Sequence, residues 1–171
     1  MFELILKSLY FFLPVYFANM APVLFKWIPF ASKPIYEKWF GKNKTWRGLI
    51  VATIIGTIVF LLQKLVYNMG FTSFALIDYN GFPFLLGALM GLGAILGDLV
   101  ESYYKRKNDI LPGKSWIPWD QLDFVIGGLV LTLFFYVPKI NVIVILLLIS
   151  PLLHVAFSYL GYLLKLKKDK F

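Results

Sequence analysis

Four carboxylates flank the connection between two hydrophobic segments of this sequence. Asp98 and Glu101 stand three residues apart near the end of one segment, and Asp120 and Asp123 stand three residues apart at the start of the next. Like charges crowded beside hydrocarbon repel one another and would take up protons unless a cation compensated them. We therefore expect a cation where the four side chains converge.

The residue types favour magnesium as that cation. The sequence has no cysteine and a single histidine, His154, in a distant segment, so the ligands that zinc and copper prefer are missing from the cluster. Magnesium usually takes one or two protein carboxylates and fills its remaining positions with water and substrate phosphates. The acidic cluster therefore predicts Mg²⁺ as a cofactor and a phosphorylated substrate.

Each acidic pair also has a purely structural interpretation. Asp120 could be a helix N-cap, with Asp123 in the favourable field of the helix start. Glu101 and Lys105 could form an ordinary ion pair one helical turn apart. Neither interpretation explains why all four acids lie at one end of two apolar segments.

Basic residues next to the cluster could bind phosphate oxygens. Lys105, Arg106 and Lys114 offer charged donors, and the dipeptide Pro112-Gly113 predicts a turn that brings the backbone close to a ligand.

A second basic set lies earlier in the chain, where residues 41–49 read GKNKTWRGL. This stretch lacks the spacing G-x-x-x-x-G-K-[ST] and is not a Walker P-loop. By itself it could be a helix start capped by Thr45. Two basic loops around an acidic cluster together predict a nucleotide site.

The elements that must position these residues are membrane helices. Of 171 residues, 60% are hydrophobic and only 15% are charged, which is too apolar for a small water-soluble domain. We expect an all-α, multi-pass protein of one domain, residues 1–171, in which Pro14 and Pro22 cause a kink or an early stop in the first helix. The five predicted spans are residues 2–23, 49–67, 82–104, 121–137 and 142–164.

The basic residues predict the orientation of these spans. Fourteen of the 17 lysines and arginines fall in residues 25–48, residues 104–120 and the C-terminal tail. By the positive-inside rule, these three regions are cytoplasmic and the N-terminus is outside. The prediction is a protein of the cell membrane with its site on the cytoplasmic face.

The motifs together resemble a known family. Residues 97–106 read GDLVESYYKR and residues 112–123 read PGKSWIPWDQLD, which is similar to the G-D-x-x-E-S-x-x-K-R and P-G-H-G-G-x-x-D-R-x-D signature of the membrane CTP-transferases, the phosphatidate cytidylyltransferases. Lys114, Ser115 and Trp116 replace His-Gly-Gly, and Gln121 replaces Arg. These departures, the chain length and GKNKTWRG match the archaeal branch of the family over nearly the whole chain.

The resemblance implies an Mg²⁺-dependent nucleotidyltransferase of phospholipid biosynthesis. Its substrates would be CTP and the phosphate of an unsaturated archaeal ether lipid, 2,3-bis-O-geranylgeranylglycerol 1-phosphate, and pyrophosphate would be released.

The resemblance also implies roles for individual residues. Asp98, Asp120 and Asp123 would hold Mg²⁺ directly or through water, and with Lys105 and Arg106 they form the expected catalytic set. The expected substrate-binding residues are Lys44, Thr45, Arg47, Glu101, Ser102, Pro112, Gly113 and Lys114.

Two other classes of function stay open at this stage. A CTP-dependent polyprenol kinase would share the nucleotide site but would transfer the terminal phosphate and release CDP. A non-enzymatic channel or assembly protein would have no use for four acids at one interface. The expected partners are CTP, a lipid phosphate and the bilayer, with no nucleic acid, and the sequence does not predict an oligomeric state.

Overall fold

The computed structural model describes residues 1–111 and 114–163, in which every regular element is a helix. The predicted all-α fold class is therefore confirmed for this part of the chain. The elements in order are α1 (Phe2–Phe11), α2 (Leu13–Leu24), α3 (Glu37–Phe40), α4 (Trp46–Asn68), the short 3₁₀ helix η1 (Tyr79–Gly81), α5 (Leu85–Lys107), α6 (Trp119–Thr132) and α7 (Ile140–Leu163).

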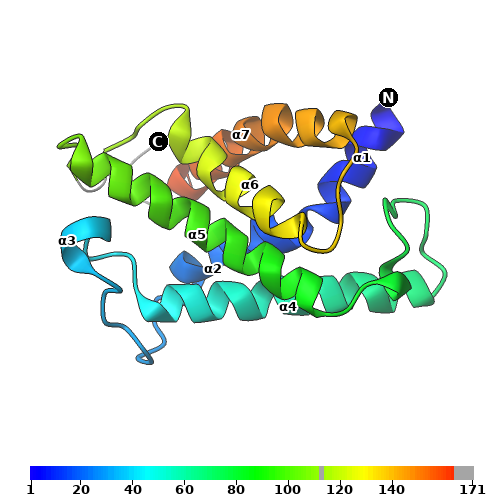
Figure 1. Ribbon diagram of the computed structural model, residues 1–171, viewed down its shortest axis with the longest axis horizontal. Coiled ribbons are helices and arrows are strands. Elements are labelled where there is room, and N and C mark those ends of the chain that lie inside the picture. The colour runs from blue at the N-terminus through cyan, green and yellow to red at the C-terminus, as the bar shows by residue number, and fades with distance from the viewer. Residues whose placement is uncertain (112–113, 164–171) are drawn as a thin grey trace.

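The long helices run back and forth between two ends of the molecule (Figure 1). Helix α5 crosses the middle and packs against α4 on one side and α6 on the other. At one end lie α3 and the loop that follows α5, and at the opposite end lie the N-terminus and the α4–α5 and α6–α7 connections. The two loops predicted to carry the site thus share one end.

The first predicted span is broken, as its proline suggested. Helices α1 and α2 meet at Phe12 with an angle of 48° between them. Pro14 lies in the first turn of α2, where it has no N–H to continue the ladder of α1. The predicted kink is confirmed near Pro14, whereas Pro22 lies inside α2, close to its end.

Several of these helices are suited to a membrane. By length and composition α4 and α5 could each cross it, and the bent α1–α2 pair could be a third span. The outward side chains of α4 are large and apolar, including Ile54, Leu62 and Leu65, as expected for a surface in contact with lipid. Helix α6 ends at Thr132, five residues short of its predicted span, and a turn follows before Pro138.

Close backbone contacts hold α5 in the centre of the bundle. A Cβ added to Gly91 would lie 2.5 Å from the carbonyl oxygen of Ala52 on α4. On the other face of α5, a Cβ added to Gly97 would overlap the backbone carbonyl of Asp123 on α6, well inside the 3.0 Å that real Cβ atoms keep. The α5–α6 contact places the residues after Gly97 directly against the start of α6.

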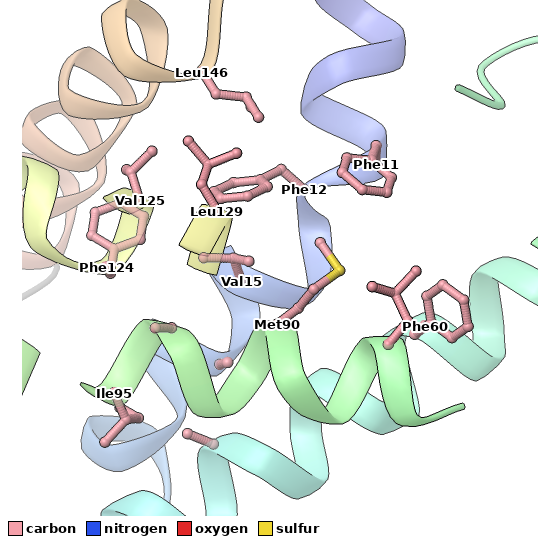
Figure 2. Close-up of a cluster of buried hydrophobic side chains, with 14 of the residues drawn as sticks. Phe11, Phe12, Val15, Phe60, Met90, Ile95, Phe124, Val125, Leu129 and Leu146 are labelled. Carbon is pink, nitrogen blue, oxygen red and sulfur yellow. The ribbon is translucent and has the colours of Figure 1, made fainter. Parts of the chain in front are cut away.

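The apolar core fills the space between the helices and extends to Leu99 and Phe124 beside the carboxylates. Phe12 and Val15 from the first helix pair, Met90 from α5 and Leu146 from α7 are fully buried, and Figure 2 shows them clustered. In a membrane bundle such side chains stabilise the fold mainly by close van der Waals packing, because lipid tails are as apolar as the core.

Candidate active site

Three carboxylates converge where α5 crosses α6. One oxygen from each of Asp98, Glu101 and Asp123 lies within 4.8 Å of the other two. Asp98 and Glu101 share a face of α5 because they are three residues apart, and the Gly97 contact brings Asp123 against that face. Glu101 is buried and the other two are partly buried, so their charges are only weakly screened by water.

The fourth predicted carboxylate, Asp120, lies beside this group rather than in it. Its Oδ1 is 2.5 Å from the Lys105 ammonium, which also lies 2.9 Å from Glu101 Oε1. Its Oδ2 accepts a 2.8 Å hydrogen bond from the backbone N–H of Trp116. The interpretation of Asp120 as an N-cap is wrong, because Pro118 holds that position; the predicted Glu101–Lys105 pair is confirmed.

Lys44 from the first loop enters the carboxylate group. Its Nζ lies 2.5 Å from Asp98 Oδ1 and 2.6 Å from Oδ2. The backbone around it is held by a short antiparallel pairing, in which Ile35 N–H donates to the Lys44 carbonyl at 2.8 Å and Arg47 N–H donates to the Ala31 carbonyl at 2.8 Å. This pairing directs the side chain across the gap from loop to α5.

The surroundings keep the Lys44 side chain charged. Burial would lower the pKa of its ammonium, but the charge and hydrogen bonds of Asp98, with Asp123 and Glu101 behind it, together raise the pKa above its ordinary value. Lys44 is therefore a cation in this site at neutral pH.

Thr45 and Arg47 build the start of α4 next to Lys44. The Thr45 hydroxyl caps the helix by accepting from Gly48 N–H at 3.2 Å, which confirms the predicted capping role. The Arg47 guanidinium donates from Nη1 to the Ile28 carbonyl at 2.6 Å. Both residues also line the cavity described next. A ligand in that cavity would therefore reach their side chains.

A cavity of about 840 Å³ lies beside the Lys44–Asp98 pair. This volume falls in the roughly 300–1,000 Å³ range of small-molecule sites. One wall is polar, with Lys44, Thr45, Arg47 and Asp98. Most of the apolar lining comes from α2, α4 and α5 and includes Met20, Val23, Leu24, Leu49, Ile95 and Leu99.

Two polar residues that line this cavity lie on helices for which the sequence predicted no site residue. Asn19 on α2 and His154 on α7 come from segments far from the charged loops. His154 also packs against the Phe124 ring, with ring centroids 5.6 Å apart. Only the packing of the helices brings these polar side chains to the site.

The other predicted residues that the structure describes have partners of their own or are exposed. The Arg106 guanidinium donates to the Ile110 carbonyl in the loop after α5, and Lys114 is exposed. Ser102 is buried, with its hydroxyl 3.4 Å from Glu101 Oε2. Pro112 and Gly113 lie outside the described residues. The substrate contacts expected of these residues stay predictions.

The carboxylate group fits a hard divalent cation. Its donors are all oxygens and they stand close enough to share one ion. The cluster already holds a cation, the Lys44 ammonium, against Asp98, which shows that this part of the site needs positive charge. Asp98, Glu101 and Asp123 are thus the residues that could bind Mg²⁺.

Comparison with known proteins decides the family. The chain matches, over residues 1–171, the family model described as "CarS-like: CDP-archaeol synthase". The chain belongs to this family. The resemblance to the archaeal branch of the membrane CTP-transferases is therefore confirmed.

Relatives in the CarS-like family are similar over almost their full length. A CDP-archaeol synthase of Pyrococcus furiosus is 31% identical over 95% of this chain and 96% of the relative. The corresponding protein of Thermococcus onnurineus is 35% identical over 92% of each chain.

A solved CarS-like neighbour shares the fold. It is described as "Structural insight into an intramembrane enzyme for archaeal membrane lipids biosynthesis", and it matches with a TM-score of 0.71 and 26% identity over 90% of this chain and 94% of its own. This neighbour and the apolar helices identify the chain as a membrane protein.

Proposed function

We propose that the protein is a CDP-archaeol synthase. It would transfer the cytidylyl group of CTP to the phosphate of an unsaturated archaeal ether lipid and release pyrophosphate. The proposal is based on one observation. The carboxylates of Asp98, Glu101 and Asp123, the basic loop with Lys44 and a cavity lie together at one end of a membrane bundle. The family membership supplies the reaction.

The cavity suits two anionic substrates that approach from different directions. CTP would enter from water and place its triphosphate against Lys44 and Arg47. The lipid would enter from the bilayer along Met20, Val23 and Leu24, which line the cavity and are also exposed on α2. An apolar edge joined to a basic wall is what a lipid phosphate needs.

The reaction requires alignment and charge neutralisation more than proton transfer. A phosphate oxygen of the lipid attacks the α-phosphorus of CTP, and the bond from that phosphorus to the bridging oxygen breaks as pyrophosphate leaves. When bound, Mg²⁺ would neutralise the phosphates. Asp98, Glu101 and Asp123 would hold it, while Lys44 and Arg47 would stabilise charge on the triphosphate.

Lys105 and Asp120 have a supporting part in this proposal. Lys105 bridges Glu101 and Asp120, so it fixes the Glu101 carboxylate toward the other two acids. Asp120 would have to break its ion pair with Lys105 to bind Mg²⁺ directly. Otherwise it would act on the ion through a water molecule or through Lys105. Arg106 and Lys114 remain candidates for phosphate contacts at the end of α5.

The proposal includes one membrane domain over residues 1–171 with five spans. Helices α4, α5 and α7, the bent α1–α2 pair and the shorter α6 would be the spans. The distribution of basic residues supports an outside N-terminus and a site on the cytoplasmic face of the cell membrane.

Product analysis tests the activity. The purified protein, given CTP, Mg²⁺ and an unsaturated ether-lipid phosphate, should release pyrophosphate only when all three are present. Release of CDP instead would indicate a lipid kinase, and no turnover of CTP would count against an enzyme of either kind.

A further inference from the structure

We propose that Lys44 is an exchangeable cation that occupies the metal site until the substrates arrive. Its ammonium holds Asp98 in the structure described here and would move to the triphosphate when a divalent cation binds to the carboxylates. This inference rests on the proposed function and adds to it a coupling between metal binding and nucleotide binding.

The geometry of the pair is the first support. Lys44 Nζ is nearly equidistant from the two oxygens of Asp98, at 2.5 and 2.6 Å. A cation that binds Asp98 from this side would have to take the same position. Lys44 and a metal ion would therefore compete for one face of the Asp98 carboxylate.

The charges around the pair favour an exchange of one cation for another. Asp98 stands with Glu101 and Asp123 in a group whose ligand oxygens lie within 4.8 Å of one another. Lys105 is occupied by Glu101 and Asp120, so Lys44 is the cation that compensates Asp98. Because carboxylates repel one another in such a site, a divalent cation that binds there would take over the charge compensation and release Lys44.

The loop allows the side chain to move while its backbone stays. The Lys44 carbonyl is fixed by Ile35 N–H, and the next residue, Thr45, caps α4. The flexible four-carbon side chain begins at this fixed point and lies along a cavity of about 840 Å³ that Arg47 also lines. A rotation of the side chain would bring the ammonium beside Arg47 for phosphate binding.

The exchange predicts that cation and nucleotide bind cooperatively. Without a divalent cation, Lys44 would stay paired with Asp98, and the triphosphate of CTP would be repelled by the carboxylates. With the cation bound, Lys44 would be released as a second positive charge for the triphosphate. Each ligand would then favour the other, as linkage requires.

Amine labelling followed by mass spectrometry tests the movement. Lys38 on α3 is exposed and lies in the same loop region, so it serves as the internal reference. Without divalent cations, Lys44 should react about tenfold more slowly than Lys38, because it is held in an ion pair. Mn²⁺ alone should speed the labelling of Lys44 severalfold, and Mn²⁺ with CTP should slow it again, while Lys38 stays constant.

Direct binding of Mn²⁺, measured by electron paramagnetic resonance, completes the test. Lys44→Met should bind Mn²⁺ about tenfold more tightly than the parent, because the competing charge is gone, and CTP should no longer increase that affinity. Lys38→Met should behave like the parent. Bound Mn²⁺ with unchanged Lys44 labelling would overturn the exchange alone. Failure of both the parent and Lys44→Met to bind Mn²⁺ would overturn the metal site on which the exchange rests.

Discussion

Gly97 lies directly against the backbone carbonyl of Asp123, with no room for a Cβ between α5 and α6. Asp98 follows Gly97 in the chain, so this contact also sets the separation between the Asp98 and Asp123 carboxylates. A close helix crossing and a candidate metal site are thus parts of one arrangement.

Gly97→Ala should therefore impair both stability and activity. The added methyl group would push α5 from α6 at a backbone contact that cannot rotate away, with a cost of about 1–3 kcal/mol or more. We expect a lower midpoint of thermal unfolding in detergent and a large loss of pyrophosphate release. Gly81→Ala is the matched control, because a Cβ there meets open space; equal behaviour of the two variants would contradict the crossing as described.

Asp98→Asn and Asp123→Asn should each lower turnover by more than about hundredfold, since the amide keeps the shape of the side chain but loses the charge that attracts a divalent cation. Pyrophosphate release measured across a magnesium titration checks this. Asp109→Asn is the control, because Asp109 is exposed at a positive φ of 56° that asparagine also tolerates. A rate near that of the parent for Asp98→Asn at millimolar Mg²⁺ would rule out the metal-site interpretation.

Asp120→Asn tests whether this carboxylate positions Lys105 or binds the metal ion. In the structure Asp120 contacts Lys105 and the Trp116 N–H, so we expect its loss to lower the maximal rate without changing the magnesium concentration that gives half of that rate. The same titration provides the measurement. A clear increase in the magnesium requirement would instead make Asp120 a ligand of the ion.

The C-terminus should be cytoplasmic. Helix α7 runs toward the end of the molecule that carries the basic loops, and the positive-inside rule assigns that end to the cytoplasm. A reporter fused after Phe171 should be protected from protease in intact cells and cleaved after lysis. Cleavage in intact cells would contradict both the orientation and a site that uses cytoplasmic CTP.

Much of the fold could be predicted from the sequence because its causes are local. The apolar runs and Pro14 predict the long helices and the bend between α1 and α2, and Thr45 predicts the start of α4. The early end of α6 cannot be predicted in this way, since the residues after Thr132 are as apolar as those before it.

The site could be predicted only in part, because some of its features are local in the sequence and others depend on tertiary packing. The spacing of Asp98 and Glu101 places them on one face of a helix, and the motif places Asp123 nearby. The partners of these residues depend on tertiary packing: nothing in the sequence pairs Lys44 with Asp98, 54 positions away, or brings His154 and Asn19 to the same cavity. The division of the four acids into a group of three and an Lys105–Asp120 pair likewise follows from the crossing of α5 and α6.

The fate of labelled phosphorus in CTP tests the central claim most directly. The purified protein would be given an unsaturated ether-lipid phosphate, Mg²⁺ and CTP labelled either at the α-phosphorus or at the γ-phosphorus, with ATP labelled in the same two positions as the control nucleotide. The account predicts that the lipid product carries the α label of CTP, that the γ label leaves as pyrophosphate, and that ATP labels the lipid far less. Transfer of the γ label to the lipid, or no label in the lipid at all, would contradict it.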